Sequence, residues 1–163
     1  MVMFYSITTN EKKGKKKMKD YPSLTIYHPS SRGVGSALRL KLIPFVYDDP
    51  HRSGKLEIKI AQQDGDEYDW SCALYENLDF EDVTRMLMVF RGEAESINDG
   101  AGITHWWTHT FNMSHVIEPV HGYRMMLTSG DRLAAFMLKP AEALGISLAL
   151  EQSMSKLVFE MEG

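Results

Sequence analysis

The stretch "GSALRLKLIPF", Gly35 to Phe45, alternates leucine with arginine and lysine from Leu38 to Leu42. Because successive side chains of a β-strand point to opposite faces, this alternation predicts a strand with one apolar and one cationic face. The run "KLEIKIAQQ", Lys55 to Gln63, repeats the pattern. Two strands of a sheet are therefore expected to present a row of cations on the face opposite their leucines and isoleucines: Arg39, Lys41, Lys55 and Lys59.

The chain on either side of these two runs completes a first structural unit. Further strands are expected at 23–29 and 67–78, and the period then changes to that of a helix. Asp79 is placed to cap a helix that begins at Phe80, and Gly92 is placed to end it. The apolar stripe expected on this helix is Phe80, Val83, Leu87 and Phe90.

The second half of the chain repeats this plan. A long strand or bent pair is expected at 103–117, and two further strands at 122–129 and 132–139. Pro140 suits the first turn of a helix that is expected to run to about Met161. Its core-facing stripe would be Ala143, Ile146, Leu150, Leu157 and Met161. Strands followed by a helix, twice over, predict an α+β domain with an internal structural repeat.

Length and composition limit the class of protein. A chain of 163 residues with 44% hydrophobic and 25% charged residues suits one globular domain, which we place at 21–163. The single cysteine, Cys72, excludes an internal disulfide framework and favours an intracellular, reducing compartment, whether a bacterial or phage cytoplasm or an organelle. No stretch approaches the roughly 18 apolar residues of a membrane span, and the first ten residues do not resemble a secretory signal.

The charge is unevenly distributed along the chain. Six of the 18 Lys and Arg residues lie in "EKKGKKKMKD", so residues 1–20 are expected to form a basic flexible tail. A phosphate-contacting arm and a targeting signal are alternatives for this segment. From Asp20 onward the chain holds 12 Lys or Arg against 21 Asp or Glu, a net charge of about −9.

Within that acidic body, the cations fall on strands and the acids on helices. The two helical segments, 79–95 and 140–162, carry nine acids against three Lys or Arg. The strand runs carry most of the remaining cations, including Arg124, Arg132 and Lys139. An outward cationic sheet can neutralise phosphates even on an acidic molecule, whereas the plainer interpretation is that these side chains keep exposed strand faces soluble.

Four motifs, taken in order, point to a known family. "EYDW" (67–70) lies at the start of the fourth predicted strand, and "TIYHPSSRGVGSAL" (25–38) covers the first hairpin. "HGYRMMLTS" (121–129) and "KPAEALGISLALEQSM" (139–154) occupy matching places in the second half. Together they resemble the Whirly family, plant single-stranded DNA-binding proteins whose fold is shared in outline by kinetoplastid guide-RNA-binding proteins. The resemblance covers about residues 21–161, although the family's lysine-containing motif is replaced here by Val34 to Leu38, without lysine.

This resemblance implies a fold and a function. The fold would be the Whirly-type double ββββα repeat, with two antiparallel sheets and two helices. The function would be binding of single-stranded DNA with little sequence preference, in DNA protection, recombination and repair, or transcription regulation. The assembly would be a homotetramer, with helices at its centre and DNA held by strands of neighbouring subunits. RNA binding on the same fold, and an oligomeric scaffold for proteins, are the alternatives.

Single-stranded nucleic acid also requires aromatic side chains on which bases stack. "THWWTHTF" (104–111) is the best candidate, because adjacent tryptophans on a strand point to opposite faces and one of them should point outward. Plain β-core and cover for an oligomer contact are the alternatives for either tryptophan. Tyr68, Trp70 and Tyr123 are weaker candidates, and Trp70 is expected to be buried. The residues expected to bind nucleic acid are Arg39, Lys41, Lys55, Lys59, Trp106, Trp107, Phe111, Tyr123 and Arg124.

No pattern in the sequence indicates an enzyme. Two of the histidines, His105 and His109, lie four residues apart on an expected strand, roughly 13 Å at 3.3 Å per residue, which is too far to share one zinc ion. Cys72 has no neighbouring histidine to activate it, and "GAG" near Gly100 lacks the lysine of a phosphate loop. We therefore expect no catalytic residues, no metal site and no cofactor.

Overall fold

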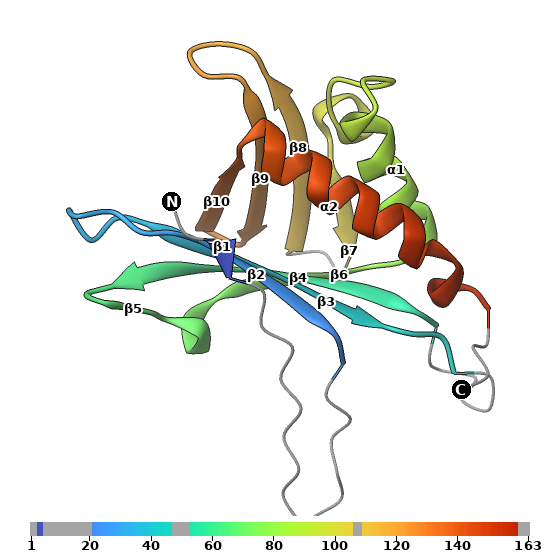
Figure 1. Cartoon of the computed structure of the whole chain (residues 1–163), viewed down its shortest axis with the longest axis horizontal. Helices are drawn as coiled ribbons and strands as arrows, with labels where there is room; N and C mark the ends of the chain where they lie inside the picture. Colours follow the sequence, from blue (N-terminus) through green and yellow to red (C-terminus); the bar gives the residue numbers. More distant parts are fainter. Residues whose placement is uncertain (1–2, 5–20, 47–52, 106–108, 160–163) are drawn as a thin grey trace, which may run out of the picture.

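The computed structural model describes residues 3–4, 21–46, 53–105 and 109–159 (Figure 1). They form two antiparallel sheets and two helices, in the order of the predicted double repeat. The lysine-rich segment Lys12–Lys19 lies outside the described residues.

The first sheet is built around the two alternating runs. Its strands are β1 (Met3–Phe4), β2 (Ser23–His28), β3 (Ser36–Ile43), β4 (Lys55–Asp64), β5 (Glu67–Tyr68) and β6 (Leu74–Leu78). The order is β1-β2-β3-β4, and both β5 and β6 then pair with β4. The register places Arg39 directly opposite Lys59, and Leu40 opposite Ile58. As expected, the alternation therefore places the cationic side chains of β3 and β4 on one face of the sheet and their leucines and isoleucines on the other.

The second sheet is a simple meander. It contains β7 (Ile103–His105), β8 (His109–Val116), β9 (Gly122–Ser129) and β10 (Arg132–Leu138), in the order β10-β9-β8-β7. Phe111, Met113, Met125 and Phe136 point from this sheet into the core, each with at most 1% of its surface exposed. The outward face of the same strands carries Arg124 and polar residues such as Thr110.

The helices follow the two sheets in sequence. They are α1 (Phe80–Phe90) and α2 (Pro140–Ser153), with short 3-10 segments η1 (Trp70–Cys72), η2 (Ile97–Gly100) and η3 (Met154–Leu157). Asp79 caps α1 as predicted, because its carboxylate accepts the backbone N–H of Asp82 at 2.9 Å. Gly92, at φ 76°, follows the helix and allows the chain to turn.

One core joins the sheets and helices. Figure 1 shows α1, α2 and the second sheet on the same side of the first sheet, above the face that carries Leu38, Leu40 and Ile58. The opposite face of the first sheet therefore holds the cations. Burying leucine and isoleucine side chains in this way is worth roughly 1.5–3 kcal/mol each, which makes the strand register difficult to shift.

Several boundaries differ from the predictions. The fourth strand is interrupted, since Asp69 accepts the backbone N–H of Cys72 and turns the chain into η1 before β6 begins. The strand β1 lies within the segment expected to be a tail and pairs with β2. The α2 helix ends at Ser153, and Phe80 is exposed on α1 rather than part of its buried stripe. None of the described helices is long and apolar enough to span a bilayer.

Each helix begins with a buried acid that binds a histidine of the other repeat. Asp82, the third residue of α1, lies 2.6 Å from Nε2 of His105 at the end of β7. Glu142, the third residue of α2, lies 2.9 Å from Nε2 of His28 at the end of β2. Both carboxylates also accept the backbone N–H of the residue that precedes their helix. We call this reciprocal arrangement the crossed His–acid pairs.

Candidate nucleic-acid interface

The side of the first sheet that faces away from the helices gathers four of the predicted cations. We call this surface the cationic face, and it is formed by Arg39, Lys41, Lys55 and Lys59. Arg39 and Lys59 are direct cross-strand neighbours, and Lys41 lies opposite Glu57. Like charges placed opposite each other destabilise a sheet, so a pair of this kind favours a bound anion.

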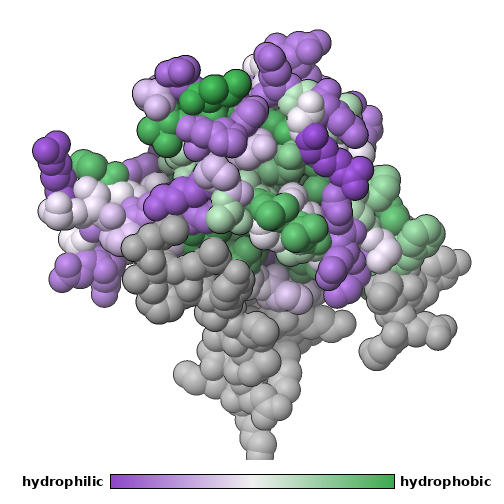
Figure 2. All heavy atoms as spheres, turned by 45° about the horizontal axis from the view of Figure 1, so that its top comes forward, coloured by the Kyte–Doolittle hydropathy of each residue, from purple (hydrophilic) through white to green (hydrophobic). Residues whose placement is uncertain are grey.

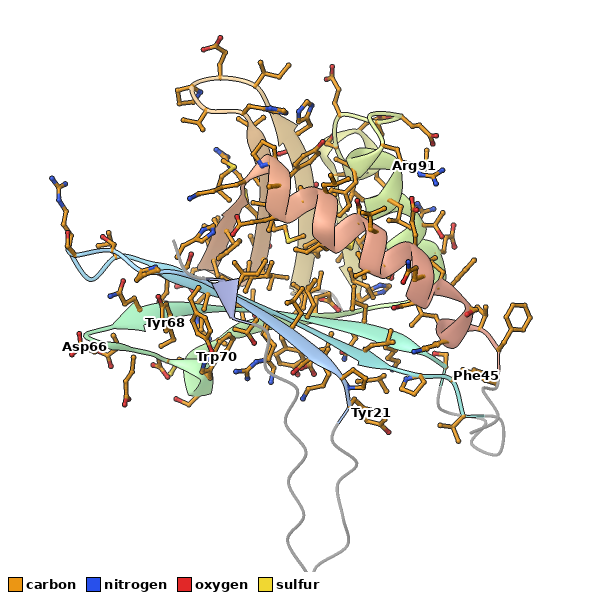
Figure 3. All side chains as sticks on the ribbon, viewed as in Figure 1. Tyr21, Phe45, Asp66, Tyr68, Trp70 and Arg91 are labelled. Carbon is orange, nitrogen blue, oxygen red and sulfur yellow. The ribbon has the colours of Figure 1, made fainter. Side chains whose placement is uncertain are left out.

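An aromatic side chain orders the arginine of this pair. The guanidinium carbon of Arg39 lies 3.8 Å from the centre of the Trp70 ring, a cation–π contact. Its Nε donates to Thr25 Oγ1 at 3.3 Å. Trp70 belongs to η1, which lies on the outward side of the sheet together with Tyr68 (Figure 3). The expectation that Trp70 is buried is therefore wrong, because it remains partly exposed over Arg39.

The lysine of the pair has an aromatic neighbour too. Lys59 Nζ lies 5.8 Å from the centre of the Tyr75 ring and 3.6 Å from Glu57 Oε1. Neither Arg39 nor Lys41 takes part in any of the ion pairs found among the described residues. Tyr75 itself is 48% exposed on the outward side of β6.

A cavity of about 540 Å³ adjoins the cationic face at β6. Lys55 and Tyr75 line it from the first sheet, while His105 and His109 line it from the second. β6 pairs only with β4 in the described structure, and its residues Tyr75, Glu76 and Asn77 line this cavity.

Two buried acids lie beside this cavity. Glu76, 5% exposed, points from β6 toward the core side, and burial raises the pKa of its carboxyl above the ordinary value. The hydrogen bond from the backbone N–H of Asn77 and the nearby histidines His105 and His109 oppose that rise. Burial likewise raises the pKa of Asp82, which the bonds from Asp79 and His105 partly offset.

The remaining predicted site residues do not join the cationic face. Phe111 is 0% exposed, so its assignment as a base-stacking residue is wrong. Tyr123 shares the inward face of the second sheet, where its ring lies 5.2 Å from that of Phe90. Arg124 is exposed on the outward face of the second sheet rather than beside Arg39. Trp106 and Trp107 lie outside the described residues.

Sequence reasoning missed Tyr75 as a member of this surface. The alternation "LYENL" (74–78) contained the signal, because Leu74, Glu76 and Leu78 point inward and therefore place Tyr75 and Asn77 outward. Treating 67–78 as one uninterrupted strand obscured that pattern. As for metal ligands, the described part of the chain contains no group of three or more His, Cys, Asp or Glu side chains placed to hold an ion.

Known proteins resemble this chain in structure rather than in sequence. No family model matches the sequence, and no curated protein matches it either. Solved structures do match. WHY3 of Arabidopsis thaliana aligns with a TM-score of 0.63 at 15% identity, over 86% of this chain and 90% of that one. WHY1 of the same plant gives 0.61 at 16% identity, over 88% of each chain.

A third match comes from a trypanosome. The MRP1/MRP2 structure of Trypanosoma brucei aligns with a TM-score of 0.59 at 16% identity, over 83% of this chain and 84% of that one. Alignments that cover so much of the chain extend over both repeats. The chain has the Whirly fold, as the sequence resemblance predicted.

Proposed function

We propose that this protein binds single-stranded nucleic acid through the cationic face, and that DNA is its substrate. The observation that carries the proposal is the Arg39–Lys59 pair, two cations held side by side on an outward strand face, each beside an aromatic ring. Phosphates would neutralise this pair, and the release of condensed counterions would supply much of the affinity.

Low sequence preference follows from the kind of contacts available. Rings such as Trp70 and Tyr75 offer stacking surfaces, and every base has a face that stacks. The cationic side chains reach phosphates, which carry no sequence information directly. The Whirly fold and the sequence resemblance to single-stranded DNA-binding proteins support the same function. Roles in DNA protection, recombination and repair, or transcription regulation are part of this proposal, which involves no catalysis.

The test is a charge reversal on the cationic face. Arg39→Glu with Lys41→Glu should weaken binding of a labelled mixed-sequence single strand at least tenfold in fluorescence anisotropy at low salt. The salt dependence should also become shallower, by about 0.7 in the log–log slope for each phosphate that the variant no longer neutralises. Duplex DNA and single-stranded RNA of equal length are measured in parallel, because RNA binding is the alternative on this fold.

The control makes the same change of charge elsewhere. Arg85→Glu with Arg91→Glu alters two exposed arginines of the α1 region, which pair with Glu81 and Glu151. This variant should keep most of the affinity for the single strand. Equal losses in both variants would mean that only net charge matters, and unchanged affinity in the cationic-face variant would refute the assignment of this surface.

We further propose that copies of the chain assemble through α2, as the homotetramer implied by the Whirly resemblance. Leu144 and Leu148 are 62% and 52% exposed on the side of α2 that points away from the core. Gly145 lies between them, and a Cβ built there would meet no atom within 4 Å. Figure 2, which turns this side of the molecule forward, shows hydrophobic residues reaching the surface in the middle of the face.

A second copy is the occupant that this composition favours. Glycine within a helix costs about 1 kcal/mol relative to alanine, and nothing described in this chain requires it at position 145. Exposed leucines around a small residue allow two helices to approach closely. A face of this kind would be self-complementary across a two-fold axis, the commonest symmetry of soluble oligomers.

A further inference from the structure

The cavity beside β6 differs chemically from the cationic face that it adjoins. Its walls combine Lys55, His105 and His109 with the acids Glu76 and Asp79. Of the residues that the structure describes, Lys55 is the one Lys or Arg that lines it, beside two acids, whereas the neighbouring strand face has an excess of cations. A phosphate would gain little from such walls, but an uncharged heterocyclic ring with donors and acceptors on its edge would suit them.

The size of the cavity agrees with this chemistry. Its volume of about 540 Å³ lies within the range of roughly 300–1,000 Å³ that is typical of small-molecule sites. The cavity opens beside β6, and Asn77 of that strand lines it. The buried Oδ1 of Asn77 has no hydrogen-bond partner among the described residues, so it can accept from the edge of a ring.

Two aromatic rings line the cavity side by side. The centres of the Tyr75 and His109 rings are 6.3 Å apart, and their planes are tilted by 49°. That separation is within the roughly 4.5–7 Å of a direct aromatic contact, so the two rings form one aromatic wall of the cavity. A planar base inside the cavity can stack on the exposed Tyr75 ring and contact His109 beside it.

Tyr75 also connects the cavity to the cationic face. Lys59 Nζ lies 5.8 Å from the centre of the same ring. A strand whose phosphate is held at Lys59 would thus bring its next base to Tyr75, at the mouth of the cavity. A base inside a duplex cannot leave its stack without cost, so such a site would favour single strands.

We propose that this cavity is a base pocket: it takes one unstacked nucleobase of a strand bound on the cationic face, in contact with Tyr75 and His109. This inference rests on the proposed function, and it adds a contact that depends on the base rather than on the phosphate.

The experiment separates base-dependent from phosphate-dependent binding. The full chain is titrated with a labelled thymidine oligonucleotide and with an abasic strand of the same length and charge. Tyr75→Leu with His109→Leu removes both rings but keeps apolar volume. This variant should lose about fivefold or more in affinity for the thymidine strand, as expected for one stacked base, and should bind the abasic strand as the unmodified chain does.

Three controls make the result decisive. Tyr75→Phe keeps a ring and should keep the preference for the strand with bases. Phe159→Leu removes an exposed ring that does not line the cavity, and it should leave the affinity for both strands unchanged. Thermal unfolding verifies that each variant folds. If the leucine variant retains the full preference for bases, the pocket is refuted while the proposed function stands. If the unmodified chain binds neither strand, the proposed function fails and the pocket fails with it.

Discussion

Glu76 is an acid in the middle of an inward strand face. Its neighbours across the sheet are apolar, beginning with Ile58 directly opposite on β4. Burial raises the pKa of its carboxyl, so the folded protein holds a proton there over a pH range in which the unfolded chain has already lost it. Stability from this group is therefore complete below its ordinary pKa and decreases as the pH rises through the folded value.

Replacing Glu76 with glutamine should remove this penalty. Glu76→Gln keeps an oxygen for the backbone N–H of Asn77 and has no charge to bury. The free energy of unfolding should rise at pH 7 and change little at pH 4. In the unmodified protein, each pH unit over which only the folded state holds the Glu76 proton lowers the free energy of unfolding by at most about 1.4 kcal/mol. Urea unfolding at both pH values measures this. A gain of equal size at pH 4 would contradict the argument.

Among the elements, those whose shape depends on local pattern were predictable. The alternation in β3 and β4 and the Asp79 cap of α1 all hold, because each depends on residues close in sequence. The inward position of Phe111 was not predictable in the same way. Alternation divides a strand into two sets of side chains, but the packing of the second sheet on the first decides which set is buried. The η1 segment was missed because the Asp69 cap interrupts a run that looks like a strand.

The crossed His–acid pairs should contribute measurably to stability. The Glu142 side chain is only 1% exposed, so His28→Leu would leave a buried carboxylate without its histidine. We expect the free energy of unfolding to fall by about 1–3 kcal/mol, the usual cost of an unpaired buried polar group. His105→Leu should have a similar effect through Asp82.

An exposed ion pair provides the comparison for those variants. Arg85 and Glu81 are 2.7 Å apart, but both are open to solvent on α1. Glu81→Gln should therefore lower the free energy of unfolding by no more than about 0.5 kcal/mol. Chemical denaturation of all three variants under one condition tests the ranking, which would be overturned if His28→Leu cost no more than Glu81→Gln.

At the scale of the whole molecule, we propose one side for nucleic acid and another, on α2, for a second copy of the chain. Gly145→Ala tests the α2 interface. Because the site is an exposed helix interior, alanine should raise the stability of the isolated chain by about 0.5–1 kcal/mol, yet its methyl group should hinder close helix approach. Dilute chemical denaturation and light scattering after size exclusion measure the two effects. Ser147→Ala, at the flank of the same helix, is the control for helix propensity, and assembly unchanged by Gly145→Ala would refute the α2 interface.

The crossed His–acid pairs also constrain how this molecule can change over evolutionary time. A repeat that arises by duplication is usually free to diverge, since each copy keeps its own internal contacts. Here the first repeat holds the histidine for the acid of the second, and the second holds the histidine for the acid of the first. A substitution at His28 therefore removes the histidine partner of Glu142, which lies in the other half of the chain. The two halves of the chain are therefore expected to tolerate a change at one of these four positions best when its partner changes with it.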